Sequence, residues 1–169
     1  QVSLDEKVAR DFVASKAADL IINIVDASSL ERNLYLTSQL IEMRVPMILV
    51  LNMMDAVKKR GIRIDIDALS TQLGCPVVAI SAANKQGIDA LKTVINKSVI
   101  SQPVPTVKID YTAALEHAVS HISPLLTDIA VQHNCDLRWL ALRLLEDDTL
   151  AKHIAGIDLL PKIAQLQRQ

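Results

Sequence analysis

The chain has 169 residues, half of them hydrophobic and 22% charged, with a formal net charge of −1. This composition supports a folded domain and excludes general disorder, while the near-neutral charge and 2% aromatic content argue against a nucleic-acid partner. Two cysteines are too few for a disulfide framework, and the sequence contains no run of about 18 apolar residues that would predict a membrane span.

The first 100 residues alternate between helical and strand-like patterns. A helix is expected to begin at Ser3, which stands in capping-box spacing with Glu6. Near-continuous apolar runs predict buried strands at residues 19–28, 47–52 and 76–81. Helical periodicity predicts helices at 30–43, 55–61, 65–74 and 87–100, the first of them capped by Ser28 or Ser29. Strands that alternate with helices indicate an α/β fold with a parallel sheet.

The rest of the chain is predicted to be helical. Two prolines and a lack of periodicity suggest a linker at residues 101–107, before a helical domain at 108–169. Pro124 either kinks the first long helix of this domain or starts a second helix capped by Ser123. An amphipathic helix is expected at about 136–148, followed by one or two shorter helices.

Two loops that follow neighbouring predicted strands contain the candidate binding residues. They are Asn52, Met53, Met54 and Asp55 after the second strand, and Ser81, Ala82 and Ala83 after the third. Ligands of open α/β sheets bind beyond the carboxyl ends of the strands, so the two loops could hold one flat polar ligand.

Guanine fits the chemistry of these loops. The Asp55 carboxylate can accept hydrogen bonds from N1–H and the 2-amino group of guanine together. The Ala82 backbone N–H could donate to guanine O6, and Asn52 could bond N7 and tie the loops together. Adenine would leave Asp55 facing an acceptor. Alone, an Asn-x-x-Asp spacing is usually a turn after a strand, but its combination with Ser-Ala-Ala after the next strand favours a guanine site.

Other tempting residues have simpler interpretations. His117 and His121 have the i, i+4 spacing of metal ligands on a helix, with Glu116 adjacent, but no further ligand is evident. The basic run 58–60 is interpreted as a solvated helix end. We therefore predict no metal site and assign no catalytic residue.

At these motifs the chain resembles the cytosolic GTPase region of bacterial ferrous iron transport protein B. The most specific stretches are INIVDASSLERNLYLTSQLIE, at 22–42, and IRIDIDALSTQLGCPVVAISA, at 62–82. The NMMD stretch corresponds to the guanine-specificity motif, SAA corresponds to the last G motif, and RWLALRLLEDD is similar to the helical domain of that family. The resemblance implies a P-loop GTPase-like parallel sheet with flanking helices, followed by a small all-α domain.

The resemblance also implies ligands and partners. GTP or GDP is the expected ligand, and the transmembrane permease domain of the parent protein is an expected partner, with this segment at the cytoplasmic face of the bacterial inner membrane. Most GTPases have Lys where this chain has Met53, which keeps an apolar surface for the base but loses the charge. The expected role is a regulatory module of ferrous iron uptake.

The printed sequence lacks the motifs that handle phosphates. It contains neither G-x-x-x-x-G-K-[ST] nor the Asp-x-x-Gly and switch-threonine motifs. We therefore expect residues 1–100 to be the C-terminal part of a G domain. Mg²⁺ binding and GTP hydrolysis are expected only with the N-terminal half of the parent protein, and either that segment or a second copy is an expected partner. The alternative is a non-catalytic protein-interaction module without a working nucleotide site.

Overall fold

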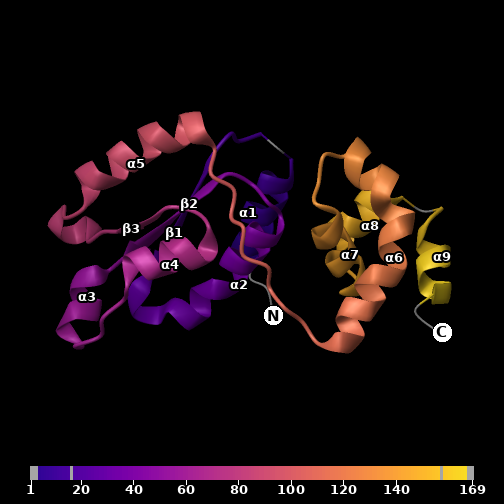
Figure 1. Ribbon diagram of the computed structural model, residues 1–169, viewed down its shortest axis with the longest axis horizontal. Helices are drawn as coiled ribbons and strands as arrows, with labels where there is room; N and C mark the ends of the chain where they lie inside the picture. The colour runs from indigo at the N-terminus through magenta and orange to yellow at the C-terminus, as the bar shows by residue number, and fades with distance from the viewer. Residues whose placement is uncertain (1–3, 16, 157, 167–169) are drawn as a thin grey trace. The chain divides into compact units, whose positions relative to one another are not determined.

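The computed structural model describes residues 4–15, 17–156 and 158–166. The chain forms two compact units, residues 1–107 and 108–169. Figure 1 shows a sheet covered by helices in the first unit and helices alone in the second. Among the described residues, no helix combines the length and apolarity needed to cross a membrane.

Three parallel strands form the sheet of the first unit, in the order β1-β2-β3. They are β1 (Ile21–Asp26), β2 (Met47–Asn52) and β3 (Val77–Ala79). The register pairs Asp26 with Asn52, and Leu51 with Ala79, so the carboxyl ends of the strands meet at one edge of the sheet. The second strand has the predicted bounds, whereas β1 and β3 are shorter than predicted.

In the described part of the first unit, five α-helices accompany this sheet. They are α1 (Leu4–Ala14), α2 (Leu30–Glu42), α3 (Met54–Lys59), α4 (Ile66–Leu73) and α5 (Ile88–Ser101). Figure 1 shows α5 above the sheet and α2 and α4 below it. Residues of α5, including Leu91 and Val94, pack against Ile48 and Val50 of β2. Because helices cover both faces, β2 is buried throughout from Met47 to Leu51, which explains its unbroken apolar sequence.

The turn after β1 differs from the prediction. Ser29 stands immediately before α2, but its side chain makes no capping hydrogen bond. Instead, the Asp26 carboxylate accepts hydrogen bonds from the backbone N–H of Ser28 at 2.8 Å and from its hydroxyl at 2.7 Å, which caps a 3₁₀ turn, η1 (Ala27–Ser29). This turn ends β1 two residues earlier than predicted, because the chain leaves the extended conformation at Ala27. The predicted cap at Ser3 lies outside the described residues.

The segment predicted as a linker is held on the first unit. The backbone N–H of Met47 donates to the Pro103 carbonyl at 3.0 Å, and that of Thr106 donates to the Leu73 carbonyl at 2.9 Å. Gly74 allows this contact, because its φ is +74° and an added Cβ would lie 2.0 Å from the Thr106 hydroxyl oxygen. Any larger residue at position 74 would displace the segment from the end of α4.

The described part of the second unit contains helices and no strand, as predicted. The helices are α6 (Ala113–Gln132), α7 (Leu137–Leu145), α8 (Thr149–Ala155) and α9 (Leu160–Leu166). Pro124 lies inside α6, so of the two predicted alternatives the start of a second helix is wrong. The Ser123 hydroxyl donates to the Val119 carbonyl at 2.6 Å within α6 instead of capping a new helix. Trp139 of α7 and Leu126 of α6 are among the buried core residues.

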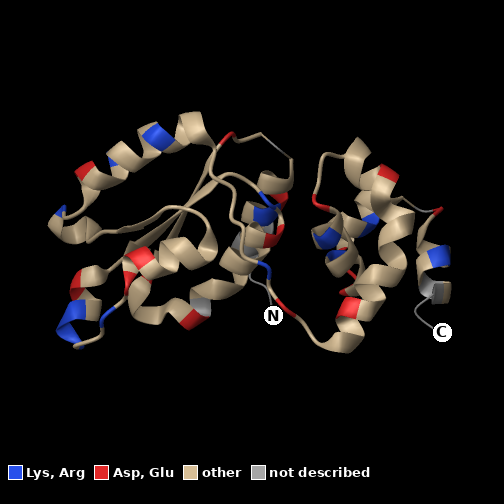
Figure 2. Cartoon of the chain, in the orientation of Figure 1, with Lys and Arg blue, Asp and Glu red and all other residues tan. Residues whose placement is uncertain are grey.

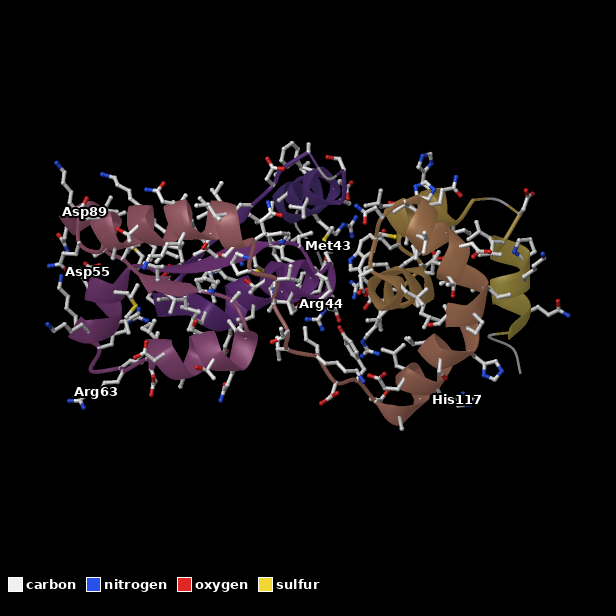
Figure 3. All side chains as sticks on the ribbon, turned by 45° about the horizontal axis from the view of Figure 1, so that its top comes forward. Met43, Arg44, Asp55, Arg63, Asp89 and His117 are labelled. Atoms are coloured by element: carbon white, nitrogen blue, oxygen red, sulfur yellow. The ribbon has the colours of Figure 1, made fainter. Side chains whose placement is uncertain are left out.

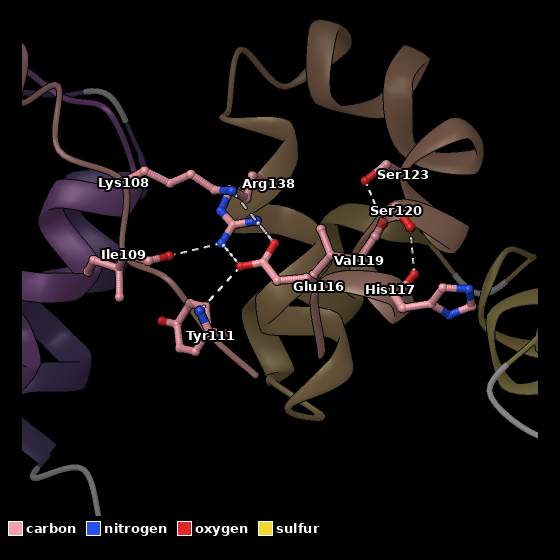
Figure 4. A network of polar contacts seen from close by, with 9 residues as sticks. All are labelled: Lys108, Ile109, Tyr111, Glu116, His117, Val119, Ser120, Ser123 and Arg138. Carbon is pink, nitrogen blue, oxygen red and sulfur yellow. Dashed lines mark hydrogen bonds and ion pairs between the residues drawn. The ribbon is translucent and has the colours of Figure 1, made fainter. Parts of the chain in front are cut away.

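An ion pair joins the start of α6 to α7 (Figure 4). The Arg138 guanidinium donates to both carboxylate oxygens of Glu116, at 2.6 and 2.7 Å, and to the Ile109 carbonyl at 2.9 Å. The backbone N–H of Tyr111 also donates to Glu116, at 3.3 Å. The hydrogen bonds from Arg138 are the main cause that lowers the pKa of Glu116 to about 2. The pair therefore fixes the chain before α6 against α7.

This ion pair predicts a pH dependence of stability. The folded pKa of Glu116 lies below its ordinary value of 4.5, so its contribution to stability is present above about pH 4.5 and is lost as the pH falls towards 2. Glu116→Gln should flatten the decline in unfolding free energy over this range. Denaturant unfolding at several pH values, monitored by the fluorescence of Trp139, would measure the unfolding free energy of the second unit, because Trp139 is the sole tryptophan. Glu31→Gln, on an exposed site of α2, is the control, and an unchanged pH slope in Glu116→Gln would contradict the prediction.

Candidate functional site

Two loops meet where β2 and β3 end. The first runs from Asn52 into α3, and the second runs from Ile80 through Ser81 into a 3₁₀ turn, η2 (Ala82–Asn84). The backbone N–H of Met54 donates to the Ile80 carbonyl at 3.2 Å, so the loops are tied directly to each other. They lie beyond the carboxyl ends of parallel strands, where open α/β sheets bind ligands.

The Asn52 side chain bridges the two loops. Its Oδ1 accepts hydrogen bonds from the backbone N–H of Met53 at 2.8 Å and from that of Ala82 at 3.1 Å. The predicted tie between adjacent loops is therefore present. Because the N–H of Ala82 already donates to Asn52, a guanine O6 at this position would have to share that donor or replace the bond.

Met53 has a left-handed backbone conformation, with φ 63° and ψ 27°. Residues other than Gly, Asn and Asp seldom adopt this backbone conformation, and residues that do are concentrated at functional sites. Met53 is 40% exposed, so an apolar surface is available beside the Asn52 bridge. Ala82 and Ala83 are also exposed, and their small side chains leave room next to the backbone of η2.

Asp55 receives a hydrogen bond from the opposite loop. The hydroxyl of Ser81, a buried residue, donates to Asp55 Oδ1 at 2.8 Å. This bond is the main cause that lowers the pKa of the Asp55 carboxyl, and the charge of Lys59 lowers it further. The carboxylate is therefore ionised at neutral pH, where it can only accept hydrogen bonds. Figure 3 shows Asp55 at the same end of the first unit as Asp89, at the start of α5.

A depression of ≈ 690 Å³ lies beside these loops. Its lining includes Met54, Asp55 and Val57 from the first loop and α3, with Asn84 and Gln86 from the second loop. Lys58, Lys59 and Arg63 also line it, and Figure 2 shows the basic residues gathered at the far end of α3. The structure thus places Met54 in this depression, while Met53 remains on the surface of the loop.

Two contributors to the site were not predicted from the sequence. The Asn84 side-chain NH₂ donates to the Ser81 hydroxyl oxygen at 3.1 Å, and the Arg60 guanidinium donates to the Ser28 carbonyl at 3.0 Å. The second bond ties the end of α3 to the turn after β1. The only signals for these roles in the sequence are the three-residue spacing of Ser81 and Asn84 and the position of Arg60 in a basic run.

The histidine pair shows no further ligand in the described part of the chain. His117 and His121 are exposed on α6, with ring centroids 5.1 Å apart. No group of three or more His, Cys, Asp or Glu side chains among the described residues is placed to hold a metal ion. Burial raises the pKa of the Cys75 thiol to about 11, which makes this cysteine a poor metal ligand and nucleophile.

We predict that the histidine pair retains no metal. Protein loaded with Zn²⁺ or Fe²⁺ and then dialysed should contain no stoichiometric metal by elemental analysis, because two imidazoles without further ligands form a weak site. His121→Ala and His133→Ala, a control at another exposed histidine, should give the same low metal content as the unchanged protein. Stoichiometric metal that His121→Ala removes and His133→Ala retains would contradict this prediction.

Comparison with known proteins identifies one family along nearly the whole chain. The family model described as ferrous iron transport protein B matches residues 1–95, and the FeoB cytosolic helical domain matches residues 111–169. The Fe(2+) transporters FeoB of Escherichia coli (strain K12) and Salmonella typhimurium are each 43% identical to this chain over 157 residues, or 92% of it. The chain spans 20% of the length of these relatives.

Solved structures resemble nearly the whole chain. The cytosolic domain of L. pneumophila FeoB has a TM-score of 0.81 and 35% identity, and a GDP-bound mutant of S. thermophilus NFeoB has a TM-score of 0.82 and 38% identity. The matches cover 99% and 98% of this chain, respectively, and 64% of each solved chain. S. thermophilus NFeoB bound to GDP·AlF4⁻ and K⁺ has a TM-score of 0.77 at 38% identity, over 98% of this chain and 65% of that one. This likeness confirms the predicted fold class, a P-loop GTPase-like parallel sheet with flanking helices followed by a small all-α domain.

Proposed function

The chain belongs to the ferrous iron transport protein B family, within its cytosolic GTPase region, and we propose that its first unit binds the base of GTP or GDP. In this proposal Asn52 and Asp55 read the base, while Met53, Met54, Ser81, Ala82 and Ala83 complete the pocket. The relatives crystallised with GDP support a guanine nucleotide as the ligand.

The observation that carries the proposal is the hydrogen bond from the Ser81 hydroxyl to Asp55 Oδ1, at 2.8 Å. This bond links the two motifs that the sequence analysis singled out, and it favours the ionised carboxylate and gives it a defined partner in the opposite loop. Guanine presents N1–H and a 2-amino group side by side, and a fixed carboxylate can accept from both. Adenine has an acceptor at N1, so it would offer Asp55 no donor from the base, at a cost of about 1–3 kcal/mol.

The remaining residues fit a flat base. The exposed thioether of Met53 offers a polarisable surface for the face of the ring. The exposed methyl groups of Ala82 and Ala83 leave the backbone of η2 accessible. Asn52 holds the two loops together, so the pocket is formed before the nucleotide arrives. We place phosphate binding, Mg²⁺ binding and GTP hydrolysis in the parent protein, because the printed sequence has no phosphate-loop motif.

The proposal extends to the role of the chain in the parent protein. Residues 1–100 are assigned to the G domain and residues 108–169 to the helical domain, which would connect nucleotide binding to the transmembrane permease at the cytoplasmic face of the inner membrane. The module would regulate ferrous iron uptake according to the bound nucleotide. The full-length relatives are Fe(2+) transporters, which supports iron as the transported ion.

A competition titration tests the proposal. Protein of the same length as the crystallised relatives would be titrated with fluorescent GDP, which would then be displaced by unlabelled GDP or ADP. We expect GDP to compete at least about 10-fold better than ADP, because the edge of adenine that faces Asp55 offers the carboxylate no donor. Equal competition by ADP would refute base recognition and favour the protein-interaction alternative. The exposed apolar side chains of Ile24 and Phe12 are the observation that supports that alternative.

A further inference from the structure

We propose that Asn84 is a positioning residue for base recognition, which acts on Asp55 through the Ser81 hydroxyl. The inference rests on the proposed guanine site and identifies an additional residue that sets its selectivity. In this arrangement Asn84 acts through Ser81. Its amide determines which way the Ser81 hydroxyl points, and that hydroxyl orients the carboxylate.

Three side chains form a continuous hydrogen-bonded chain. The Asn84 NH₂ donates to Ser81 Oγ at 3.1 Å, and Ser81 Oγ donates to Asp55 Oδ1 at 2.8 Å. The backbone N–H of Asn84 also donates to the Ser81 carbonyl at 3.1 Å, so both parts of Asn84 return to the same residue. Ser81 is 2% exposed, which leaves its hydroxyl little contact with water.

The chemistry of the three groups fixes the direction of these bonds. Ionised Asp55 can only accept, so the single proton of the Ser81 hydroxyl must point to it. The Ser81 oxygen then has only acceptor capacity left, so only a donor can pair with it there. The Asn84 NH₂ is that donor. An acceptor at position 84 would compete with Asp55 for the one hydroxyl proton and weaken the orientation of the carboxylate.

The backbone around Asn84 holds it in this position. Ser81 and Gln86 form a bridge in which each backbone N–H donates to the other residue's carbonyl, at 3.1 Å in both directions. Gly87 follows with φ +77°, and an added Cβ there would lie 2.4 Å from the Ala79 carbonyl oxygen. The loop therefore closes over a short span, and Asn84 stays opposite the Ser81 hydroxyl.

The test compares GDP with inosine diphosphate, which lacks the 2-amino group. GDP engages both oxygens of a correctly oriented carboxylate, whereas inosine diphosphate offers N1–H alone. In protein of the length of the crystallised relatives, Asn84→Ala should weaken GDP binding about fivefold and narrow the GDP preference over inosine diphosphate. Asn84→Asp keeps the shape of the side chain but replaces its NH₂ donor with an acceptor oxygen. This variant should weaken GDP binding by about tenfold or more.

Two controls separate positioning from general damage. Lys85→Gln changes an exposed neighbour in the same loop that does not line the depression, and it should keep the wild-type ratio of GDP to inosine diphosphate affinities. In a Ser81→Ala background, adding Asn84→Ala should change that ratio no further, because the connection to Asp55 is already gone. Thermal melting should show the Asn84 variants folded, since Asn84 is exposed.

The outcomes distinguish this inference from the proposed function. If the unchanged protein prefers GDP over ADP and both Asn84 variants keep its ratio of GDP to inosine diphosphate affinities, the role of Asn84 is refuted and the guanine site stands. If the unchanged protein does not distinguish GDP from ADP, the proposed function fails and the inference fails with it. A narrowed ratio of GDP to inosine diphosphate affinities in Asn84→Ala and Asn84→Asp, absent in Lys85→Gln, supports the inference.

Discussion

Asp55→Asn is expected to change the base preference of the site from guanine to xanthine nucleotides. Xanthine carries a carbonyl where guanine has its 2-amino group, and the NH₂ of the substituted amide would donate to that carbonyl. Its amide oxygen would still accept from N1–H. For guanine, the substitution removes a charge-assisted hydrogen bond at a cost of roughly 1.5–3 kcal/mol, or about 10- to 150-fold in affinity.

The measurement is competition between GDP and xanthosine diphosphate in protein of the length of the crystallised relatives. Asp89→Asn is the matched control, because Asp89 lies at the same end of the first unit and its side chain is fully exposed. It removes one negative charge without changing the proposed pocket, so GDP should still bind as before. If Asp55→Asn left the affinity for GDP unchanged, Asp55 would not be part of the base-binding site.

The 169-residue chain on its own is expected to self-associate. In the described part of the chain, β1 lies at the edge of the sheet and pairs only with β2. Its exposed side chains include Ile22, at 40%, and Ile24, at 59%, and the strand from Ile21 to Val25 contains no proline or charge. Edge strands of this kind pair readily with other chains, whereas natural edges are protected by charges, prolines or covering segments.

Light scattering and thermal melting would compare this chain with protein of the length of the crystallised relatives. We expect the shorter form to be polydisperse. The N-terminal G-domain segment, added in trans, should raise its solubility and its affinity for GDP. Ile24→Lys should reduce association, whereas Ile100→Lys, a control at an exposed residue of α5, should have less effect. A monodisperse 169-residue monomer that ignores the added segment would show that the β1 edge needs no partner.

The sequence predicted the elements more reliably than their ends. β2 was predicted with the observed bounds because helices bury both of its faces, so its apolar run is unbroken. The end of β1 was missed because it depends on the Asp26 side chain, which captures the N–H of Ser28. Pro124 left two possibilities open, since local pattern does not reveal that α6 continues through it.

The candidate site was predictable to the level of loops but not of contacts. Periodicity located the loops that hold Asn52, Asp55 and Ser81, and parallel strands bring such loops together. The hydrogen bond between Asp55 and Ser81 joins residues 26 positions apart and depends on the register of β2 and β3. The turn that brings Asn84 to the Ser81 hydroxyl has no distinct sequence signature. This contact could therefore be identified only from the structure.

The position of bound GDP tests the central claim most directly. A crystal structure of protein of the length of the crystallised relatives, grown with GDP, would show which groups contact the base. We predict that the two carboxylate oxygens of Asp55 lie about 2.7–2.9 Å from N1 and N2 of guanine, with Ser81 still donating to the carboxylate. GDP bound with its base away from Asp55, or held through its phosphates alone, would contradict guanine recognition by these two loops.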